Sequence, residues 1–173
     1  KQTIMQKIRL AEKERVLEEF RDRAGEITTG TIVRFNRNDV IIDIDNTEAV
    51  MPSKERVPTE DYEIGERIRA YIVNVRDRER GPEIVLSRSH PDFVRRLFEL
   101  EVSEINDGTM DIKGIAREAG FRSKVAVISH DDRVDPVGAC VGMRGMRVKN
   151  IIRELSGEKI DIVRWSDNID TLI

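Results

Sequence analysis

Gly142 and Gly145 stand three positions apart and run directly into a basic segment with helical apolar spacing. Glycine reaches positive φ at little cost, so this Gly-x-x-Gly pattern predicts a tight turn that opens into a helix. A turn without side chains also lets a sugar-phosphate backbone approach closely, and the free N–H groups at a helix start favour phosphate. Taken alone, the four residues fit a plain helix-to-helix turn as well, so the neighbouring segments must decide.

The segments around these glycines follow a recognisable order. A strand-like run over 124–129 and a short segment of small residues over 135–140 come before them. A helix with apolar residues at 148, 151, 152 and 155 comes after them, and a second strand-like run follows at 159–165. The order strand, helix, loop, helix, strand is that of a KH core, whose Gly-x-x-Gly loop grips about four nucleotides of RNA.

Other phosphate-binding loops are excluded by spacing. A dinucleotide-binding fingerprint would need glycine where Cys140 stands, and a Walker loop would need Lys-Ser or Lys-Thr directly after its second glycine. One cysteine and two histidines also argue against a disulfide framework or a zinc site. We interpret Cys140 as a small core residue and expect no catalytic residue, metal or cofactor.

Charge is distributed unevenly along the chain, although the net charge is −3. Residues 108–165 hold 11 basic and 8 acidic residues, whereas residues 27–88 hold 10 basic and 12 acidic ones. The basic excess therefore coincides with the Gly-x-x-Gly loop, as expected for a nucleic-acid-binding surface. The sequence contains neither a secretory signal nor an apolar run of membrane-spanning length, so we expect a cytoplasmic protein without membrane contact.

Residues 27–88 have an apolar period of two, which predicts strands. The apolar phase reverses at Ile72-Val73, as expected where a strand bulges around a barrel. Five short strands with an irregular excursion between the third and the fourth predict an OB-type β-barrel. The predicted strands are 31–35, 40–44, 48–51, 67–76 and 83–87.

Several segments resemble known families. Residues 30–33 through 86–88 resemble an S1 domain, and the segments that follow resemble the NusA family of bacterial transcription factors. The run Asp-Pro-Val-Gly-Ala-Cys-Val-Gly at 135–142 is the most distinctive of these, and the resemblance covers roughly residues 1–165. The other matching segments are 89–93, 97–102, 115–118 and 157–165.

With this resemblance we predict a multidomain α+β fold. A helix over 1–25 would link to a missing N-terminal domain, and a five-stranded OB-fold S1 β-barrel would span 27–88. A type II (prokaryotic) KH domain would span 89–165, because a helix and a strand precede its core, and 166–173 would begin a truncated second KH domain.

The resemblance implies a non-catalytic RNA-binding elongation factor that modulates pausing, intrinsic termination and antitermination by RNA polymerase. Its implied partners are single-stranded nascent RNA, RNA polymerase in the full-length protein, and other elongation or antitermination factors. An S1-KH RNA-entry subunit of an exosome-like degradation complex is the alternative. A mainly protein-binding scaffold is a third possibility, because the barrel is net acidic.

The predicted RNA-binding residues fall into three groups. The first group is the loop and the start of its helix, in which the glycines admit the phosphate backbone, basic side chains neutralise it and apolar ones floor the groove. The second is a positive margin of surrounding basic residues, and the third is the barrel surface, where Tyr71 or Phe35 would be a stacking platform unless it packs in the core. The groups are Val141, Gly142, Met143, Arg144, Gly145, Arg147, Val148, Lys149 and Ile162; Arg117, Arg122, Lys124 and Arg164; and Arg34, Arg37, Tyr71, Arg76 and Arg78.

Overall fold

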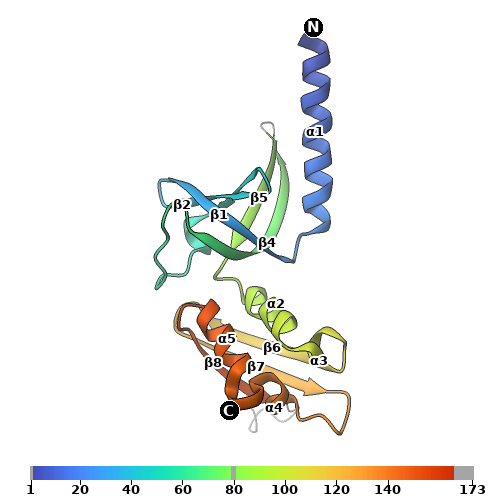
Figure 1. Ribbon diagram of the computed structural model, residues 1–173, viewed down its shortest axis with the longest axis vertical. Coiled ribbons are helices and arrows are strands. Elements are labelled where there is room, and N and C mark those ends of the chain that lie inside the picture. Colours follow the sequence, from blue (N-terminus) through green and yellow to red (C-terminus); the bar gives the residue numbers. More distant parts are fainter. Residues whose placement is uncertain (1, 79–80, 166–173) are drawn as a thin grey trace. The chain divides into compact units, whose positions relative to one another are not determined.

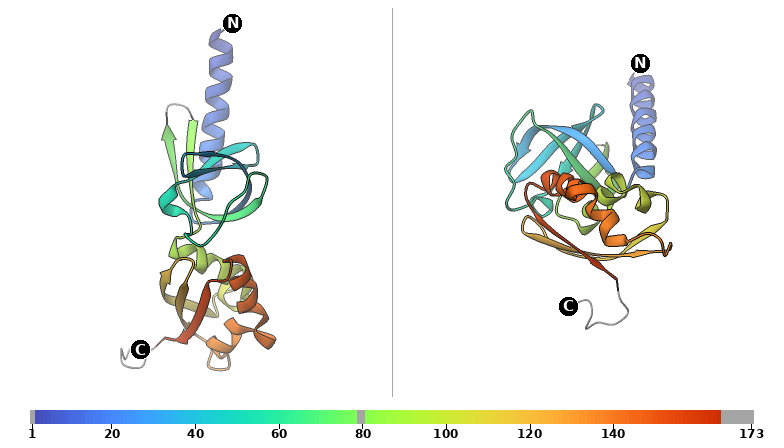
Figure 2. Two further views of the ribbon diagram at one scale, coloured as in Figure 1. Left: turned by 90° about the vertical axis from the view of Figure 1, so that its left-hand side faces the viewer. Right: turned by 60° about the horizontal axis from the view of Figure 1, so that its bottom comes forward.

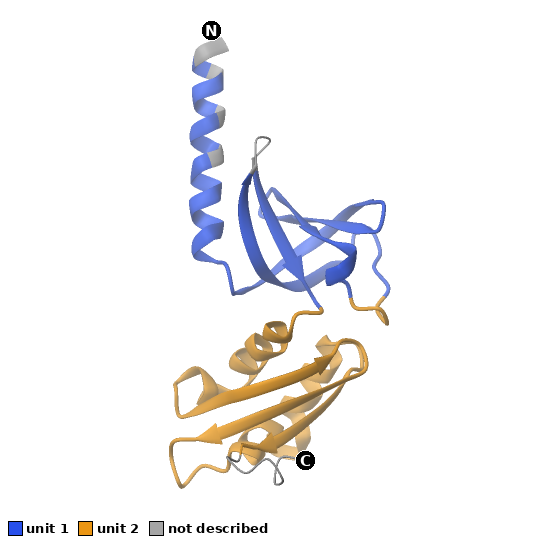
Figure 3. Ribbon diagram, turned by 180° about the vertical axis from the view of Figure 1, so that it is seen from behind, with its two compact units in different colours: residues 1–56, 61–88 blue, residues 57–60, 89–173 orange. Residues whose placement is uncertain are grey.

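The computed structural model describes residues 2–78 and 81–165. The chain divides into two compact units, shown in separate colours in Figure 3. Unit 1 holds residues 1–56 and 61–88, and unit 2 holds residues 57–60 and the chain from Ser89 onward. The predicted start of a second KH domain lies outside the described residues.

Unit 1 is built around a closed five-stranded barrel with the order β1-β2-β3-β5-β4. Neighbouring strands are antiparallel except β3 and β5, whose parallel pairing helps to close the barrel. The observed architecture, with its short 3₁₀ turn η1 (Ser53–Glu55) after the third strand, is the predicted OB-type barrel. The strands are β1 (Ile27–Asn36), β2 (Asp39–Ile44), β3 (Thr47–Met51), β4 (Arg67–Arg78) and β5 (Gly81–Ser87).

Alternation along these strands fills the barrel with aliphatic side chains. Ile32, Ile42, Ile72 and Leu86 are each 1% exposed or less, and they share one core with other strand residues. The pairing of β4 with β5 shifts register between Ile72 and Asn74, which confirms the predicted bulge. Gly30 is required on β1, because a Cβ there would lie 2.7 Å from the carbonyl oxygen of Asp43.

Helix α1 (Gln2–Asp22) precedes the barrel and contacts β4 and β5 (Figure 1). Its C-terminal half contributes Leu17 and Phe20 to the barrel core, with exposed fractions of 7% and 1%. Toward its N-terminus, Ile4, Ile8 and Leu10 are exposed. The helix therefore belongs to unit 1 through its last turns.

Unit 2 is a three-stranded sheet with helices on one of its faces (Figures 2 and 3). The sheet order is β6-β7-β8, in which β7 is antiparallel to β6 and parallel to β8. Two helix pairs, α2 with α3 and α4 with α5, alternate with the strands in the order that type II KH domains use. The elements are α2 (Pro91–Glu101), α3 (Ser103–Asn106), β6 (Met110–Glu118), β7 (Arg122–Ser129), α4 (Pro136–Val141), η2 (Met143–Gly145), α5 (Met146–Glu154) and β8 (Lys159–Arg164).

The core of unit 2 lies between the sheet and the helices. Phe93 and Phe98 of α2, Val125 and Val127 of β7, and Cys140 of α4 are completely buried. Burial raises the pKa of the Cys140 thiol to about 12, which keeps it neutral and unreactive near neutral pH. This placement agrees with the interpretation of Cys140 as a packing residue.

Candidate nucleic-acid interface

The turn between α4 and α5, which we call the clamp loop (Gly142–Gly145), uses backbone conformations that favour glycine. Gly142 has φ 78° and ψ 175°, a region that is essentially reserved for glycine. Arg144 and Gly145 follow in the left-handed region, with φ 56° and φ 73°, and the Gly145 N–H donates to the Gly142 carbonyl at 3.1 Å. The predicted tight turn into a helix is therefore confirmed.

The two glycines of the clamp loop are needed for different reasons. A Cβ on Gly142 would lie 2.7 Å from Cγ of Arg147, so packing as well as φ demands glycine there. A Cβ on Gly145 would meet only the Cε of Lys149, at 3.8 Å, which is ordinary van der Waals contact. Gly142 thus allows the turn to pack, whereas Gly145 leaves the start of α5 open.

Helix α5 begins in a way that suits an anion. Its N-cap is Gly145, and no side chain caps its first turn. The N–H of its first residue, Met146, donates to the Met143 carbonyl. The N–H groups that follow in a first helical turn have no acceptor within the helix, and they carry the positive end of its dipole. Arg144 and Lys149 are exposed at this point, and Met143 and Met146 are 84% and 53% exposed. The combination presents donors, positive charge and apolar surface together.

Arg147 differs from its basic neighbours because its guanidinium is engaged within the protein. Its Nη1 donates to Oε2 of Glu104 on α3 at 2.7 Å and to the Ala139 carbonyl of α4 at 2.8 Å. The pKa of the Glu104 carboxyl is lowered, first by its own backbone N–H and further by Arg147. Arg147 was predicted to contact RNA, and the structure shows that its guanidinium joins two helices.

The residues predicted to line and flank the RNA-binding groove lie on α4, α5 and β8, which contact one another, and on β7, which pairs with β8. Val141, Val148 and Ile162 are half-buried, as is Lys124 on β7, while Arg164 is exposed at the end of β8. Arg122 is exposed as well, and its Nε donates to Asp161 at 2.5 Å across β7 and β8. The clamp loop and β8 thus lie in the same compact unit.

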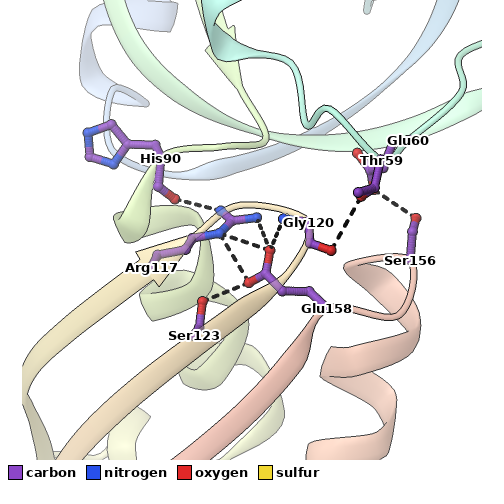
Figure 4. A network of polar contacts seen from close by, with 8 residues as sticks. All are labelled: Thr59, Glu60, His90, Arg117, Gly120, Ser123, Ser156 and Glu158. Atoms are coloured by element: carbon purple, nitrogen blue, oxygen red, sulfur yellow. Dashed lines mark hydrogen bonds and ion pairs between the residues drawn. The ribbon is translucent and has the colours of Figure 1, made fainter.

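The predicted margin of basic residues around the RNA-binding groove must be corrected at Arg117. Its side chain is 1% exposed and forms an ion pair with Glu158, which is fully buried (Figure 4). Glu158 also accepts hydrogen bonds from the Gly120 N–H and the Ser123 hydroxyl, each at 2.7 Å, and Arg117 donates to the His90 carbonyl at 2.8 Å. The prediction that Arg117 faces RNA is wrong, because every polar contact described for its guanidinium is internal.

Residues 57–60 contact the same part of unit 2. Ser156 donates to Glu60 at 2.7 Å, and the Thr59 hydroxyl donates to the Gly120 carbonyl at 3.5 Å (Figure 4). These contacts and the Arg117–Glu158 pair form what we call the Glu158 network, which also includes His90, Gly120 and Ser123. All of the contacts drawn in Figure 4 join residues of unit 2 to one another.

The barrel residues of the predicted site have mixed outcomes. Tyr71 is 9% exposed, so the prediction of a stacking platform at Tyr71 is wrong and the alternative of core packing holds. Phe35, the other aromatic residue considered, is 37% exposed. Arg34 forms a bidentate pair with Glu48 on the barrel surface. Arg37, in the turn after β1, and Arg76, on β4, are exposed. The Arg78 side chain lies outside the described residues.

Glu104 and Glu158 were missed as important residues by sequence reasoning. Their partners are 43 and 41 positions away along the chain, so no local pattern could pair them. Among the described residues no group of histidine, cysteine and carboxylates is arranged to hold a metal ion. In the same part of the chain no helix is both long and apolar enough to cross a membrane.

The architecture and the clamp loop place the chain in the class of proteins that join an OB-type barrel to a type II KH domain. Comparison with known families makes this more specific, because the family described as a NusA-like first KH domain matches residues 88–165. Residues 88–165 are therefore similar to that KH domain, and the chain as a whole is similar to NusA proteins.

Relatives extend this similarity over nearly the whole chain. The transcription termination/antitermination protein NusA of Halalkalibacterium halodurans is 48% identical over 168 residues, which are 97% of this chain and 44% of that protein. The proteins of the same name from Bacillus subtilis and Thermus thermophilus are 46% and 41% identical, over 97% and 96% of this chain and 45% and 43% of theirs. The chain therefore spans less than half the length of these curated relatives.

Proposed function

We propose that this chain binds single-stranded RNA through the clamp loop and the adjoining surface of α5 and β8. The observation that carries the proposal is the uncapped start of α5, with exposed Arg144 and Lys149 beside two glycines at positive φ. A phosphate group there would accept from free N–H groups and lie next to two cations. Single-stranded rather than duplex RNA suits this site, because splayed bases can reach the apolar residues beside the loop.

In the longer protein, we propose, this RNA is the nascent transcript. The chain would then act without catalysis in pausing, intrinsic termination and antitermination by RNA polymerase, together with other elongation or antitermination factors in the cytoplasm. The names of the relatives, which are transcription termination/antitermination proteins, support this proposal over an RNA-entry subunit of a degradation complex.

The barrel would add a weaker contact through Arg37, Arg76 and the partly exposed Phe35. Arg34 contributes less than predicted, because Glu48 already neutralises it on the barrel surface. With Tyr71 in the core, base stacking on the barrel rests on Phe35 alone among the aromatic residues considered. One base stacked on an aromatic ring contributes about 1–3 kcal/mol to the free energy of binding, so we expect the clamp loop to contribute more to RNA affinity than the barrel does.

The test is a titration of fluorescently labelled single-stranded RNA, read by anisotropy, with wild-type chain and Gly145→Asp. The new carboxylate would stand where the phosphate approaches, so we expect affinity to fall at least about tenfold, which is about 1.4 kcal/mol. Gly108→Asp is the matched control, because Gly108 also has positive φ and open space around it and lies in the turn before β6. Equal loss of affinity in both variants, or loss in neither, would reject the clamp.

A further inference from the structure

We infer that Arg147 is a positioning residue for the clamp loop, held by Glu104, and that it does not neutralise an RNA phosphate itself. This inference rests on the proposed function, since it concerns how the RNA-binding loop is kept in shape. It reverses the expectation from sequence, in which Arg147 was one of three basic residues around the glycines.

The first observation is what the guanidinium touches. One nitrogen, Nη1, reaches both Glu104 on α3 and the Ala139 carbonyl of α4, at 2.7 and 2.8 Å. Ala139 lies in the last turn of α4, where carbonyl groups have no partner within the helix. Arg147 therefore caps the helix that leads into the clamp loop while it anchors that helix to α3.

The second observation is where the side-chain stem lies. Cγ of Arg147 is the atom that a Cβ on Gly142 would approach to 2.7 Å, so the stem packs directly against the first glycine of the clamp loop. The loop thus has Arg147 against Gly142 at one end and the start of α5 at the other. Displacing the stem would leave Gly142 without its packing partner.

The third observation is a second side-chain contact of α5, one turn further along the helix, with the segment that holds Glu104. Asn150 donates to Glu101 at 2.8 Å, so Arg147 and Asn150, three residues apart, meet Glu101 and Glu104, which are also three residues apart. Residues at this spacing share one helix face. Lys149 points to a different side of α5 and is exposed, which leaves it free for phosphate.

The short helix α3 is a firm anchor for this arrangement. Ile105 is 9% exposed and the preceding Val102 is completely buried, and α3 contacts both α2 and β6. The Glu104 carboxylate is therefore held at a fixed place in unit 2. A clamp loop tied to such a point is preorganised, which lowers the ordering cost of binding RNA.

The two possible roles of Arg147 predict opposite effects of Glu104→Gln. If Arg147 positions the loop, this substitution weakens its anchor, and RNA affinity falls without a change in salt dependence. If Arg147 were a phosphate contact restrained by Glu104, the same substitution would release the guanidinium, so affinity would rise and the salt dependence would steepen. The sign of the change therefore decides between the roles.

The experiment measures affinity for a labelled single-stranded RNA across a salt series for Glu104→Gln, Arg147→Met and their combination. Methionine keeps an unbranched stem beside Gly142 but lacks the guanidinium. We expect each single variant to bind about tenfold more weakly and the double variant to bind no worse than either, with unchanged log–log slopes. A steeper slope and tighter binding in Glu104→Gln, or a slope flattened by about 0.7 in Arg147→Met, would overturn the inference.

Two further variants complete the design. Glu99→Gln is the matched control, because Glu99 pairs with Arg96 on α2 at 2.7 Å and the same chemical change there should leave affinity unchanged. Arg147→Lys keeps the charge but cannot make the same contacts, so we expect affinity between wild type and Arg147→Met. Wild-type affinity in Arg147→Lys would contradict the inference.

Amide hydrogen exchange in the RNA-free protein separates this inference from the proposed function. In Glu104→Gln we expect faster exchange at residues 142–146, with β6 and β7 unchanged. Unchanged exchange at the loop would refute the positioning role even if RNA binds. If wild-type chain binds no RNA while the loop still loosens in Glu104→Gln, the proposed function fails and the positioning role stands.

Discussion

The Glu158 network and the clamp loop use similar residues of unit 2 for opposite purposes. In the network, Arg117 and Glu158 are 1% and 0% exposed, and each of their described hydrogen bonds ends on another protein atom. In the clamp loop, Arg144 is exposed and the start of α5 has no side-chain cap. The charged groups of the network are bound to one another inside unit 2, whereas the clamp loop presents the exposed Arg144 side chain to solvent.

The difference shows that the role of an arginine depends on where its partner lies, not on its distance from a motif. Arg117 and Arg147 both stand in the basic half of the chain, and both are tied to a glutamate more than 40 positions away. Arg144 has a left-handed backbone at the tip of the turn and projects outward. The predictions that follow test this contrast, beginning with the largest effect.

Glu158→Ala should destabilise unit 2 by about 3–5 kcal/mol, because it leaves the Arg117 guanidinium buried without its counter-charge. Asp161→Ala breaks the exposed pair with Arg122 and should cost less than about 1 kcal/mol. Urea unfolding, followed by fluorescence of the single tryptophan, Trp165 directly after β8, measures both. Similar losses in the two variants would contradict the contrast between buried and exposed pairs.

Gly142→Ala should destabilise unit 2 by about 1–3 kcal/mol, because its φ and ψ are strained for alanine and the new Cβ would press on Arg147. Gly145→Asn should cost less, since asparagine tolerates left-handed backbone and the space around Gly145 is open. Thermal unfolding of the two variants gives the comparison. A larger loss in Gly145→Asn would mean that the two glycines have been assigned the wrong roles.

Arg144→Ala should flatten the log–log salt dependence of RNA binding by about 0.7, the value for one phosphate of a single strand. Its effect on the free energy of unfolding should be small, because Arg144 is exposed. Arg133→Ala is a suitable control, since Arg133 is an exposed arginine that pairs with Asp131 in the turn between β7 and α4. We would abandon Arg144 as a phosphate contact if both variants gave the wild-type slope.

The smallest effect is expected at Cys140, whose raised pKa keeps the thiol protonated in the folded state. At pH 8 an alkylating reagent should label Cys140 only through unfolded molecules, in which the thiol ionises normally. Labelling measured by mass spectrometry should therefore be negligible in the wild type and faster in Glu158→Ala. Rapid labelling of the folded wild type would place Cys140 outside the core.

Much of the fold follows from local patterns in the sequence. The period of two with its reversal at Ile72-Val73 anticipated the barrel and its bulge, and the glycine pair anticipated the turn before α5. These features depend on residues that are close along the chain, so their physical signals are visible without a structure. The order of helices and strands then specified the type II KH topology.

The individual site residues were harder to predict, because charge and exposure depend on distant partners. Nothing local distinguishes Arg117, which is buried against Glu158, from Arg122, which is exposed beside Asp161. Tyr71 was ambiguous in the same way, because an aromatic ring in a strand can stack on a base or pack in the barrel core. Its exposed fraction of 9% places it in the core. Long-range pairing decides such cases, and sequence periodicity carries no information about it.

Photochemical crosslinking of the chain to a single-stranded RNA containing 4-thiouridine, mapped by mass spectrometry, tests the central claim most directly. The account predicts crosslinks concentrated at residues 141–149 and on β8, and their loss at the loop in Gly145→Asp. It also predicts no crosslinks at Arg117. Specific crosslinks that avoid residues 141–149 and persist in Gly145→Asp would contradict the clamp as the site at which this chain holds RNA.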